Sequence, residues 1–258
     1  MTEHKHAEIH QAFREECAEN AREAGADDAL QAKSIDWLVH SCRHKYSYNF
    51  TWLGRPIIQY PQDIVALQEL VWEVKPDLII ETGVAHGGSL ILSASLLALL
   101  DLCEGRLESS RRVLGIDIEI RAHNRAAIEA HPLSSRIRLL EGSSIGDEVY
   151  VQVRAEAEDA QRVMVILDSN HTHEHVLREL ELYSPLVSSG SYCVVFDTVV
   201  EDMPADFFPD RPWGPGNNPK TAVHEFLSSQ AGQGFEIDKA LQDKLLISVA
   251  PDGFLRRR

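Results

Sequence analysis

The chain has 258 residues, of which 44% are hydrophobic and 25% charged, values that suit one globular domain with or without an appendage. Its formal net charge of −15 argues against a sequence-independent grip on nucleic acid or anionic lipid, because both need a cationic surface. Four scattered cysteines without CxxC spacing indicate neither a zinc knuckle nor a disulfide framework, so a reducing, cytoplasmic setting is expected.

The first 45 residues are predicted to be a helical segment that precedes a domain spanning 46–258. They are rich in Ala, Glu and His at helical spacing, and the sequence EAGADDA at 23–29 indicates a break between two helices. This segment is interpreted as a lid or as a contact in a homo-oligomer, with simple packing as the alternative. An irregular aromatic stretch over 46–63 and a helix over 64–74, closed by Pro76, follow.

The chain after Pro76 alternates short apolar runs with helix-like stretches, which indicates an α/β fold. Five runs are separated by connectors long enough for crossovers, so their strands are predicted to be parallel and covered on both faces. The last two runs are close together and are predicted to form an antiparallel hairpin. The expected architecture is a Rossmann-like, doubly wound, mostly parallel sheet of seven strands with a C-terminal antiparallel strand. The runs cover 77–81, 112–118, 136–142, 162–168, 190–197, 235–238 and 244–250.

The turn after the first of these strands has the features of a ligand-binding turn. Glu81 ends the strand, Gly83 and Gly87 follow, and a helix is predicted to begin near Ser89. Glycine permits close approach of a ligand to the backbone N–H groups at a helix N-terminus. The spacing is not GxGxxG, and the acidic residue suits a cationic ligand such as a sulfonium amino acid better than a pyrophosphate.

The apolar run at 89–103 is shorter than the roughly 20 residues that span a bilayer, so no membrane span is expected.

The next two strands end in residues that suit a nucleoside. Asp117 ends the second strand, where a carboxylate can accept hydrogen bonds from both ribose hydroxyls, and Glu119 is the alternative. Gly142 and Ser143 follow the third strand and are expected to lie beside an adenine. The glycine turn and Asp117 together predict nucleoside binding.

Two aspartates close the fourth and fifth strands. Asp168 and Asp197 are expected to meet at one edge of the sheet, where two carboxylates and water suit a hard cation such as Mg²⁺. The alternative is that each caps the helix after it, since Asp is a favoured N-cap residue. His171 lies three residues past Asp168, and a neutral imidazole there can accept a hydroxyl proton.

Two further histidines follow in the sequence HTHEH at 171–175. This pattern is one residue short of the HxHxDH of metallo-hydrolases, and the downstream ligands of such a site are not evident. His173 is predicted to face solvent. His175 precedes an apolar helical stripe, so a packed structural role and a catalytic role both stay open for it.

The connector at 199–219 contains five prolines and follows a strand end, and loops of this length are usually functional.

Several motifs in order resemble the cephalosporin hydroxylase family of S-adenosylmethionine-dependent methyltransferases, which includes O-methyltransferases of macrolide sugars and rhamnosyl units. They are YNFTWLGRPIIQ, ETGVAHGGSLI, LDSNHTHEHVLREL, SYCVVFDT and NNPKTA, within residues 45–255. The resemblance implies a class I methyltransferase fold and Mg²⁺-dependent methyl transfer to a hydroxyl. It also implies donor contacts for Glu81, Gly83 and Asp117, metal contacts for Asp168 and Asp197, and proton abstraction by His171.

One position departs from the family pattern. Characterised relatives carry a carboxylate immediately before the second metal aspartate, whereas this chain has Phe196 there. The expected metal shell therefore lacks one ligand. Thr198, Glu201, Asp202 or water are the candidate substitutes.

The leading hypothesis is an O-methyltransferase that acts on a sugar, glycan or natural-product hydroxyl. Asp168 and Asp197 would hold Mg²⁺, His171 would take the hydroxyl proton, and the proline-rich loop with Tyr46, Asn49 and Trp52 would wall the acceptor site. A metal-dependent hydrolase built on the histidine cluster is a second hypothesis. A non-catalytic nucleoside-binding subunit of a partner enzyme is a third.

Overall fold

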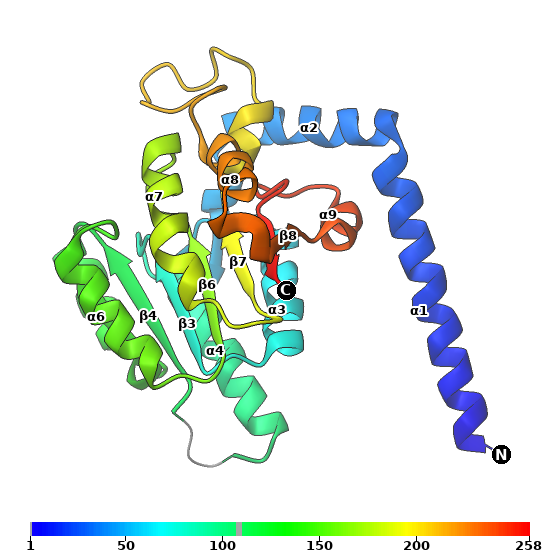
Figure 1. The fold of residues 1–258 in the computed structure, drawn as a ribbon, viewed down its shortest axis with the longest axis horizontal. Helices are drawn as coiled ribbons and strands as arrows, with labels where there is room; N and C mark the ends of the chain where they lie inside the picture. Colours follow the sequence, from blue (N-terminus) through cyan, green and yellow to red (C-terminus); the bar gives the residue numbers. More distant parts are fainter. Residues whose placement is uncertain (1, 107–109) are drawn as a thin grey trace.

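Seven strands form one sheet in the computed structural model, which describes residues 2–106 and 110–258 (Figure 1). Their order across the sheet is β5-β4-β3-β6-β7-β9-β8, and β9 alone runs in the direction opposite to the other six strands. The predicted doubly wound architecture is confirmed. The strands are β3 (Leu78–Thr82), β4 (Arg112–Asp117), β5 (Ile137–Glu141), β6 (Val163–Leu167), β7 (Tyr192–Val195), β8 (Phe235–Ile237) and β9 (Phe254–Arg257).

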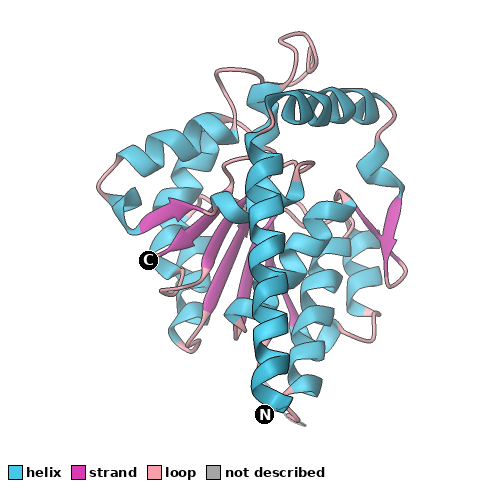
Figure 2. Ribbon diagram, turned by 90° about the vertical axis from the view of Figure 1, so that its right-hand side faces the viewer, coloured by secondary structure: helices cyan, strands magenta, loops and turns pink. Residues whose placement is uncertain are grey.

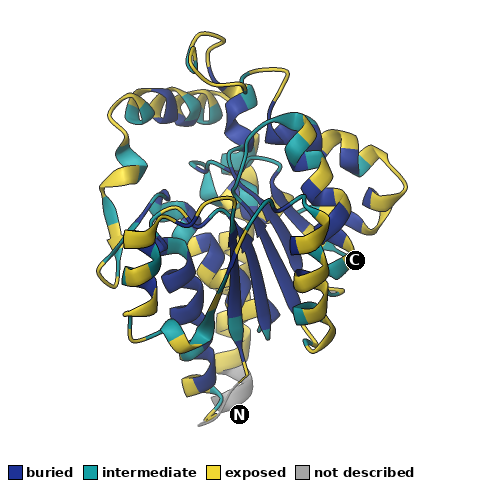
Figure 3. Cartoon of the chain, turned by 90° about the vertical axis from the view of Figure 1, so that its left-hand side faces the viewer, coloured by how far each residue is buried: buried dark blue, intermediate teal, exposed yellow. Residues whose placement is uncertain are grey.

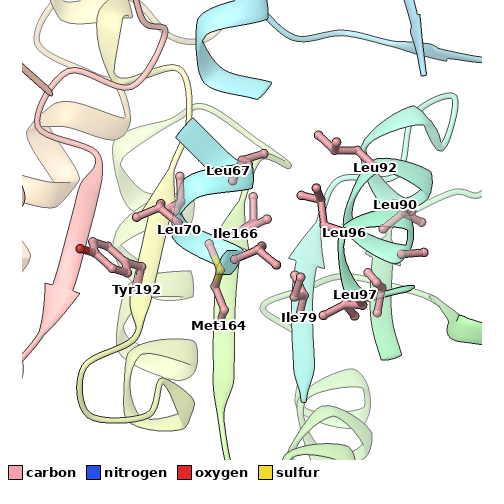
Figure 4. Packing of buried hydrophobic residues seen from close by; sticks show 14 of the residues in the cluster. Leu67, Leu70, Ile79, Leu90, Leu92, Leu96, Leu97, Met164, Ile166 and Tyr192 are labelled. Atoms are coloured by element: carbon pink, nitrogen blue, oxygen red, sulfur yellow. The ribbon is translucent and has the colours of Figure 1, made fainter. Parts of the chain in front are cut away.

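Helices cover both faces of the sheet because the side chains of its buried strands alternate between two apolar layers. Ile79 of β3 and Met164 of β6 pack against helices on one face (Figure 4), whereas Leu78 and Ile80 pack on the other. The first layer contains α3 (Pro61–Val74), α4 (Gly88–Cys103), α5 (Ala122–Glu129) and α9 (Lys239–Leu245). The second contains α6 (Asp147–Glu158), α7 (His173–Tyr183) and α8 (Pro219–Ser228). The central strands are accordingly buried along their length (Figure 3).

The last strand lies later in the chain than the sequence predicts. The run at 244–250 is not a strand, because it falls at the end of α9 and in the loop after it. Asp63 of α3 accepts hydrogen bonds from the Ser248 hydroxyl at 2.6 Å and the Val249 amide at 3.1 Å, and these contacts hold the segment as a loop. β9 at Phe254–Arg257 pairs antiparallel with β8, so the antiparallel pairing itself is confirmed.

Two helices precede the sheet domain. α1 (Thr2–Ala26) and α2 (Asp28–Arg43) meet at Asp27, whose carboxylate caps α2 by accepting from the Leu30 amide at 3.0 Å. α1 runs beside the domain, where it contacts α9, and α2 crosses above the carboxyl ends of the strands (Figures 1 and 2). Leu38 of α2 packs in an apolar cluster with Tyr60 and Met203. The role of this segment as a lid or an oligomer contact stays a prediction.

The topology places a ligand crevice between β3 and β6. From these neighbouring strands the chain proceeds to opposite sides of the sheet, and α/β proteins bind ligands at such a switch point beyond the carboxyl ends of the strands.

Among the described residues, no helix is both long and apolar enough to cross a bilayer. The remaining short elements are η1 (Tyr46–Asn49), β1 (Phe50–Trp52), β2 (Arg55–Ile57), η2 (Ser134–Arg136), η3 (Ser184–Leu186), η4 (Thr198–Asp202) and η5 (Ala231–Gly234).

Candidate active site

A cavity of about 660 Å³ lies at this switch point. The turn after β3, Asp168 after β6 and Asp197 after β7 all line it. Residues of α2, of the segment that follows α2 and of the loop at 203–213 complete the lining. Segments far apart in the sequence therefore form one pocket at the carboxyl edge of the sheet.

The glycine turn has a backbone that needs glycine. Gly83 and Gly87 have φ angles of +92° and +81°, in the left-handed region that other residues rarely adopt. A Cβ on Gly83 would lie 2.1 Å from the carbonyl oxygen of Asp168, so no side chain fits there. Gly83, Gly87 and Ser89 line the cavity, which is where donor contacts were predicted for them.

Asp117 holds the glycine turn from the neighbouring strand. Its Oδ2 accepts hydrogen bonds from the amides of Val84 at 2.8 Å and Ala85 at 3.3 Å, and its Oδ1 accepts from the Glu119 amide at 3.2 Å. A carboxylate has about four acceptor sites, so these bonds leave capacity for further donors. Asp117 is outside the cavity lining, and its contact with a ribose stays a prediction.

Glu81 lies beneath the turn rather than in the cavity. It is 2% exposed, and its carboxylate accepts hydrogen bonds from Ser89 and, at 3.4 Å, from the hydroxyl of Ser93. Burial raises the pKa of Glu81 to about 7, and the serine hydrogen bonds partly oppose that increase. Its observed contacts join the end of β3 to the first turns of α4, while a direct donor contact stays a prediction.

Gly142 and Ser143 follow β5, on the side of β4 away from the cavity. Both are partly exposed, and neither lines the cavity. The Gly142 amide donates to the carbonyl of Asp117 at 2.8 Å, which fixes the turn beside the end of β4. Their predicted position beside an adenine is untested.

Three ligand-type side chains converge at the carboxyl ends of β6 and β7. Asp168, His171 and Asp197 each offer one ligand atom, and these atoms lie within 4.8 Å of one another. His171 Nε2 is 3.0 Å from Asp197 Oδ2, with the imidazole 18% and the carboxylate 35% exposed. The sequence predicted that the two aspartates meet, and β6 and β7 are indeed adjacent and parallel.

The electrostatic environment of Asp168 is dominated by burial and by other carboxylates. Burial raises the pKa of Asp168 well above its ordinary value, and the charges of Asp197 and Glu81 raise it further. The Gln59 Nε2 donates to Asp168 Oδ2 at 3.3 Å. A bound cation would favour the ionised form that this environment disfavours.

Neither aspartate acts as a helix cap through its side chain. The N-cap residue of α7 is Thr172 rather than Asp168. Asp197 precedes η4 without a side-chain capping hydrogen bond, and its φ of 56° is unusual for a residue other than glycine. Strained backbone of this kind concentrates at functional sites, which favours a ligand role over a capping role.

The substitutes suggested for the missing metal ligand have other partners. Phe196 is buried in the core at 2% exposure. The Thr198 hydroxyl donates to a backbone carbonyl at 2.6 Å, and Glu201 accepts from the loop backbone at 2.7 Å. Asp202 forms an ion pair with Lys220. None of the three belongs to the described ligand cluster.

Aromatic side chains from the proline-rich loop reach His171. The rings of Trp213 and His171 pack edge to face with centroids 4.9 Å apart, and the Arg211 guanidinium lies 5.1 Å from the Trp213 ring centroid. Phe207 and Phe208 also line the cavity. The loop therefore forms an apolar and aromatic wall of the cavity, while its predicted place beside the acceptor stays a prediction.

The other part of the predicted wall is wrong in its residues. The Trp52 indole donates to the Ser95 hydroxyl of α4 at 2.9 Å, Asn49 donates to nearby backbone carbonyls, and Tyr46 packs edge to face against Trp37. These contacts turn all three side chains away from the cavity. The same stretch lines it instead with Lys45, Ser47 and Tyr48.

Known proteins resemble this chain in both sequence and fold. The family model described as Rhamnosyl O-methyltransferase/CmcI matches residues 44–258. A protein named rhamnosyl O-methyltransferase from Mycobacterium leprae (strain TN) is 29% identical over 222 residues, which cover 83% of this chain and 89% of the relative. One of the same name from Mycobacterium bovis (strain BCG / Pasteur 1173P2) is 30% identical, with 83% of each chain covered. A CmcI structure with Mg and S-adenosylmethionine has a TM-score of 0.53 at 19% identity and covers 82% of this chain and 77% of its own, which supports the fold.

The chain belongs to the Rhamnosyl O-methyltransferase/CmcI family. It is accordingly an S-adenosylmethionine-dependent O-methyltransferase with a class I methyltransferase fold. The resemblance drawn from the sequence motifs is confirmed. The hypothesis of a metal-dependent hydrolase is wrong. His173 and His175, which such a site would need, do not belong to the described ligand cluster.

In this methyltransferase His173 and His175 support the architecture. The prediction that His173 faces solvent holds only in part, because its side chain is 27% exposed and its ring lies 2.8 Å from Thr221 Oγ1 and 3.1 Å from Glu225 Oε2, both on α8. The Nε2 of His175 lies 3.1 Å from the Ser144 hydroxyl, away from the ligand cluster. The packed structural role is the one that these contacts support.

Gln59 and Trp213 are cavity residues that contact the ligand cluster and that were missed in the sequence. Gln59 contacts Asp168 from the segment between β2 and α3, and Trp213 contacts His171 from the long loop. Gln59 ends the motif YNFTWLGRPIIQ, which was the available signal. No periodicity or spacing relates either residue to the strand ends, so their roles depend on the tertiary fold.

Proposed function

We propose that this methyltransferase transfers the methyl group of S-adenosylmethionine to a hydroxyl of a sugar or glycoside, assisted by a divalent cation such as Mg²⁺. The observation that carries the proposal is the convergence of Asp168, His171 and Asp197 beside the glycine turn. The relatives named rhamnosyl O-methyltransferase favour a sugar acceptor.

The ligand cluster fits a hard divalent cation. Asp168 and Asp197 offer carboxylate oxygens, which Mg²⁺ prefers, from strand ends that hold them at a fixed spacing. Burial and mutual repulsion disfavour two charges there without a counter-charge. When bound, such a cation supplies Lewis-acid polarisation of the acceptor oxygen and lowers its pKa.

The glycine turn is proposed to hold the donor. Gly83 and Ser89 offer a backbone that approaches closely and a hydroxyl at the N-terminus of α4, both of which suit the amino-acid end of the donor. Asp117 is proposed to accept from the ribose, and Gly142 and Ser143 to lie beside the adenine. These assignments follow the order of the strand ends.

His171 is proposed to take the proton of the acceptor hydroxyl. The hydroxyl oxygen forms a bond to the methyl carbon, the carbon–sulfur bond breaks, and its electron pair stays on sulfur to give S-adenosylhomocysteine. A neutral imidazole that donates from Nε2 to Asp197 keeps Nδ1 as an acceptor for the proton. Trp213 packs against the ring and limits its orientations.

The test is S-adenosylhomocysteine release with donor, MgCl₂ and a panel of acceptors that includes free rhamnose, nucleotide-linked rhamnose and rhamnosyl glycosides. His171→Ala is expected to lower kcat by about 10²–10⁴-fold, the usual contribution of a general base. An unchanged kcat in that variant would remove His171 from the base role. Donor binding without turnover of any acceptor would favour a non-catalytic subunit instead.

A further inference from the structure

Gln59 has an unsatisfied polar atom in the wall of the active-site cavity. It lies between β2 and α3, is 3% exposed, and lines the cavity. Its Nε2 donates to Asp168 Oδ2 at 3.3 Å, while its Oε1 is buried without a hydrogen-bond partner among the described residues. A buried oxygen left unsatisfied costs about 1–3 kcal/mol, so this atom calls for a ligand.

Gln59 lies beside the carboxylates of the ligand cluster. Asp168, the residue it contacts, is also close enough to Asp197 and His171 for all three to share one ligand. No described lysine or arginine forms an ion pair with Asp168 or Asp197. An amide oxygen and two carboxylates are the kind of donor set that a hard cation takes, and Gln59 brings an amide to one of these two carboxylates.

The proposed cluster leaves coordination positions that water, the acceptor or a further protein oxygen can fill. Mg²⁺ takes six ligands in octahedral geometry, and the cluster provides three side chains. Phe196 has no ligand atom, and the side chains suggested as its replacements have the other partners described above.

We propose that Gln59 Oε1 is an oxygen ligand of the divalent cation held by Asp168 and Asp197, while its Nε2 positions Asp168. This inference rests on the proposed function, since it needs the cation site to exist. Gln59 thereby supplies from the α3 side the oxygen that Phe196 does not supply from β7. Because the Gln59 amide is neutral, the site carries less negative charge than it would with a third carboxylate.

Gln62 offers a control that distinguishes a ligand role of Gln59 from the effect of removing any buried amide. Gln62 lies in the first turn of α3, and its Oε1 is also buried without a partner among the described residues. Gln62 does not line the cavity. Gln62→Leu is therefore a matched control for Gln59→Leu, because both remove a buried orphaned amide from the same region.

The experiment measures binding of Mn²⁺ alone by isothermal titration calorimetry and by the EPR signal of the free ion. Gln59→Leu is expected to weaken Mn²⁺ binding by about tenfold to a hundredfold, the range seen when groups that support a metal site are lost. Gln62→Leu is expected to leave the affinity unchanged. S-adenosylhomocysteine affinity should stay the same in both variants, which shows that the donor half of the site is intact.

A second variant keeps the test decisive if Gln59→Leu does not fold. Gln59→Glu places a third carboxylate beside Asp168, so it should lower the Tm without metal and increase the rise in Tm that Mn²⁺ produces. A rise no larger than that of the wild type would overturn the proposal.

The outcomes also separate this proposal from the one it rests on. If the wild type binds no Mn²⁺, the cation site of the proposed function is wrong. If the wild type binds Mn²⁺, Asp197→Asn abolishes the binding, and Gln59→Leu binds as the wild type does, the cation site stands and the role of Gln59 is wrong.

Discussion

Glu81 contributes to the pH dependence of the stability of the ligand-free enzyme, and Glu81→Gln should remove that contribution. The carboxyl group is 2% exposed and has Ser89 and Ser93 as hydrogen-bond donors. Burial raises its pKa from 4.5 to about 7 in the folded state. Because the folded state holds the proton more tightly than the unfolded chain, this group stabilises the fold at low pH.

The sign and size of the effect follow from the two pKa values. The stabilisation is fully present below pH 4.5 and is lost as the pH rises through about 7. A difference of about 2.5 between the two pKa values, at 1.36 kcal/mol each, corresponds to about 3 kcal/mol in the free energy of unfolding. Glu81→Gln keeps an amide oxygen for the serines and never ionises. It should match the wild type near pH 4.5 and exceed it by up to about 3 kcal/mol at pH 8.

The assay is urea unfolding followed by circular dichroism at several pH values between 4.5 and 8, without donor or metal. The charge of Glu81 also raises the pKa of Asp168, so its removal acts in the same direction. Glu119→Gln, at an exposed position, is the control and should leave the pH profile unchanged. Parallel profiles for the wild type and Glu81→Gln would refute the reasoning, and so would a less stable variant at pH 8.

Three other variants test the rest of the site. Gly83→Ala should destabilise the fold by about 2 kcal/mol or more, because φ is +92° and a Cβ meets the Asp168 carbonyl; wild-type stability in urea would contradict this. Trp213→Ala should raise the acceptor KM by about tenfold, for a lost aromatic contact worth about 1.4 kcal/mol, and leave the donor KM unchanged; equal changes in both would count against an acceptor wall. His173→Ala should lower Tm slightly, for a loss of about 1 kcal/mol, with kcat retained. A large loss of kcat there would revive a catalytic role for His173.

The strands that could be predicted are those whose burial is visible in their own residues. β6 is an uninterrupted apolar run, and a strand covered on both faces is expected to read that way. β9 could not be found so easily, because two of its four residues are arginines. Arg256 lies over the Tyr192 ring and Arg257 over the Phe235 ring, so these polar residues have aromatic partners that the local sequence does not reveal.

In the candidate site, the residues at strand ends could be predicted from the sequence, whereas several of those on loops and helices could not. Asp168 and Asp197 could be predicted, because each follows a strand and the parallel order brings those ends together. The position of His173 could not, since its partners on α8 lie 48 and 52 residues away in the chain. The positions of Gln59 and Trp213 could not be predicted either, because both residues lie in loops whose conformation depends on tertiary packing.

The glycine turn, which is proposed to hold the donor and is here called the donor turn, contacts the backbone of Asp168 directly. The Asp168 amide donates to the Thr82 carbonyl at 3.0 Å, and Gly83 packs without a side chain against the Asp168 carbonyl. A shift of the donor turn therefore moves the carboxylate that is proposed to hold the cation. The segment at 45–48 and the loop at 203–213, the proposed acceptor side, contribute side chains to the same cavity. Substitutions in those two segments can therefore change which hydroxyl is methylated while donor binding is preserved.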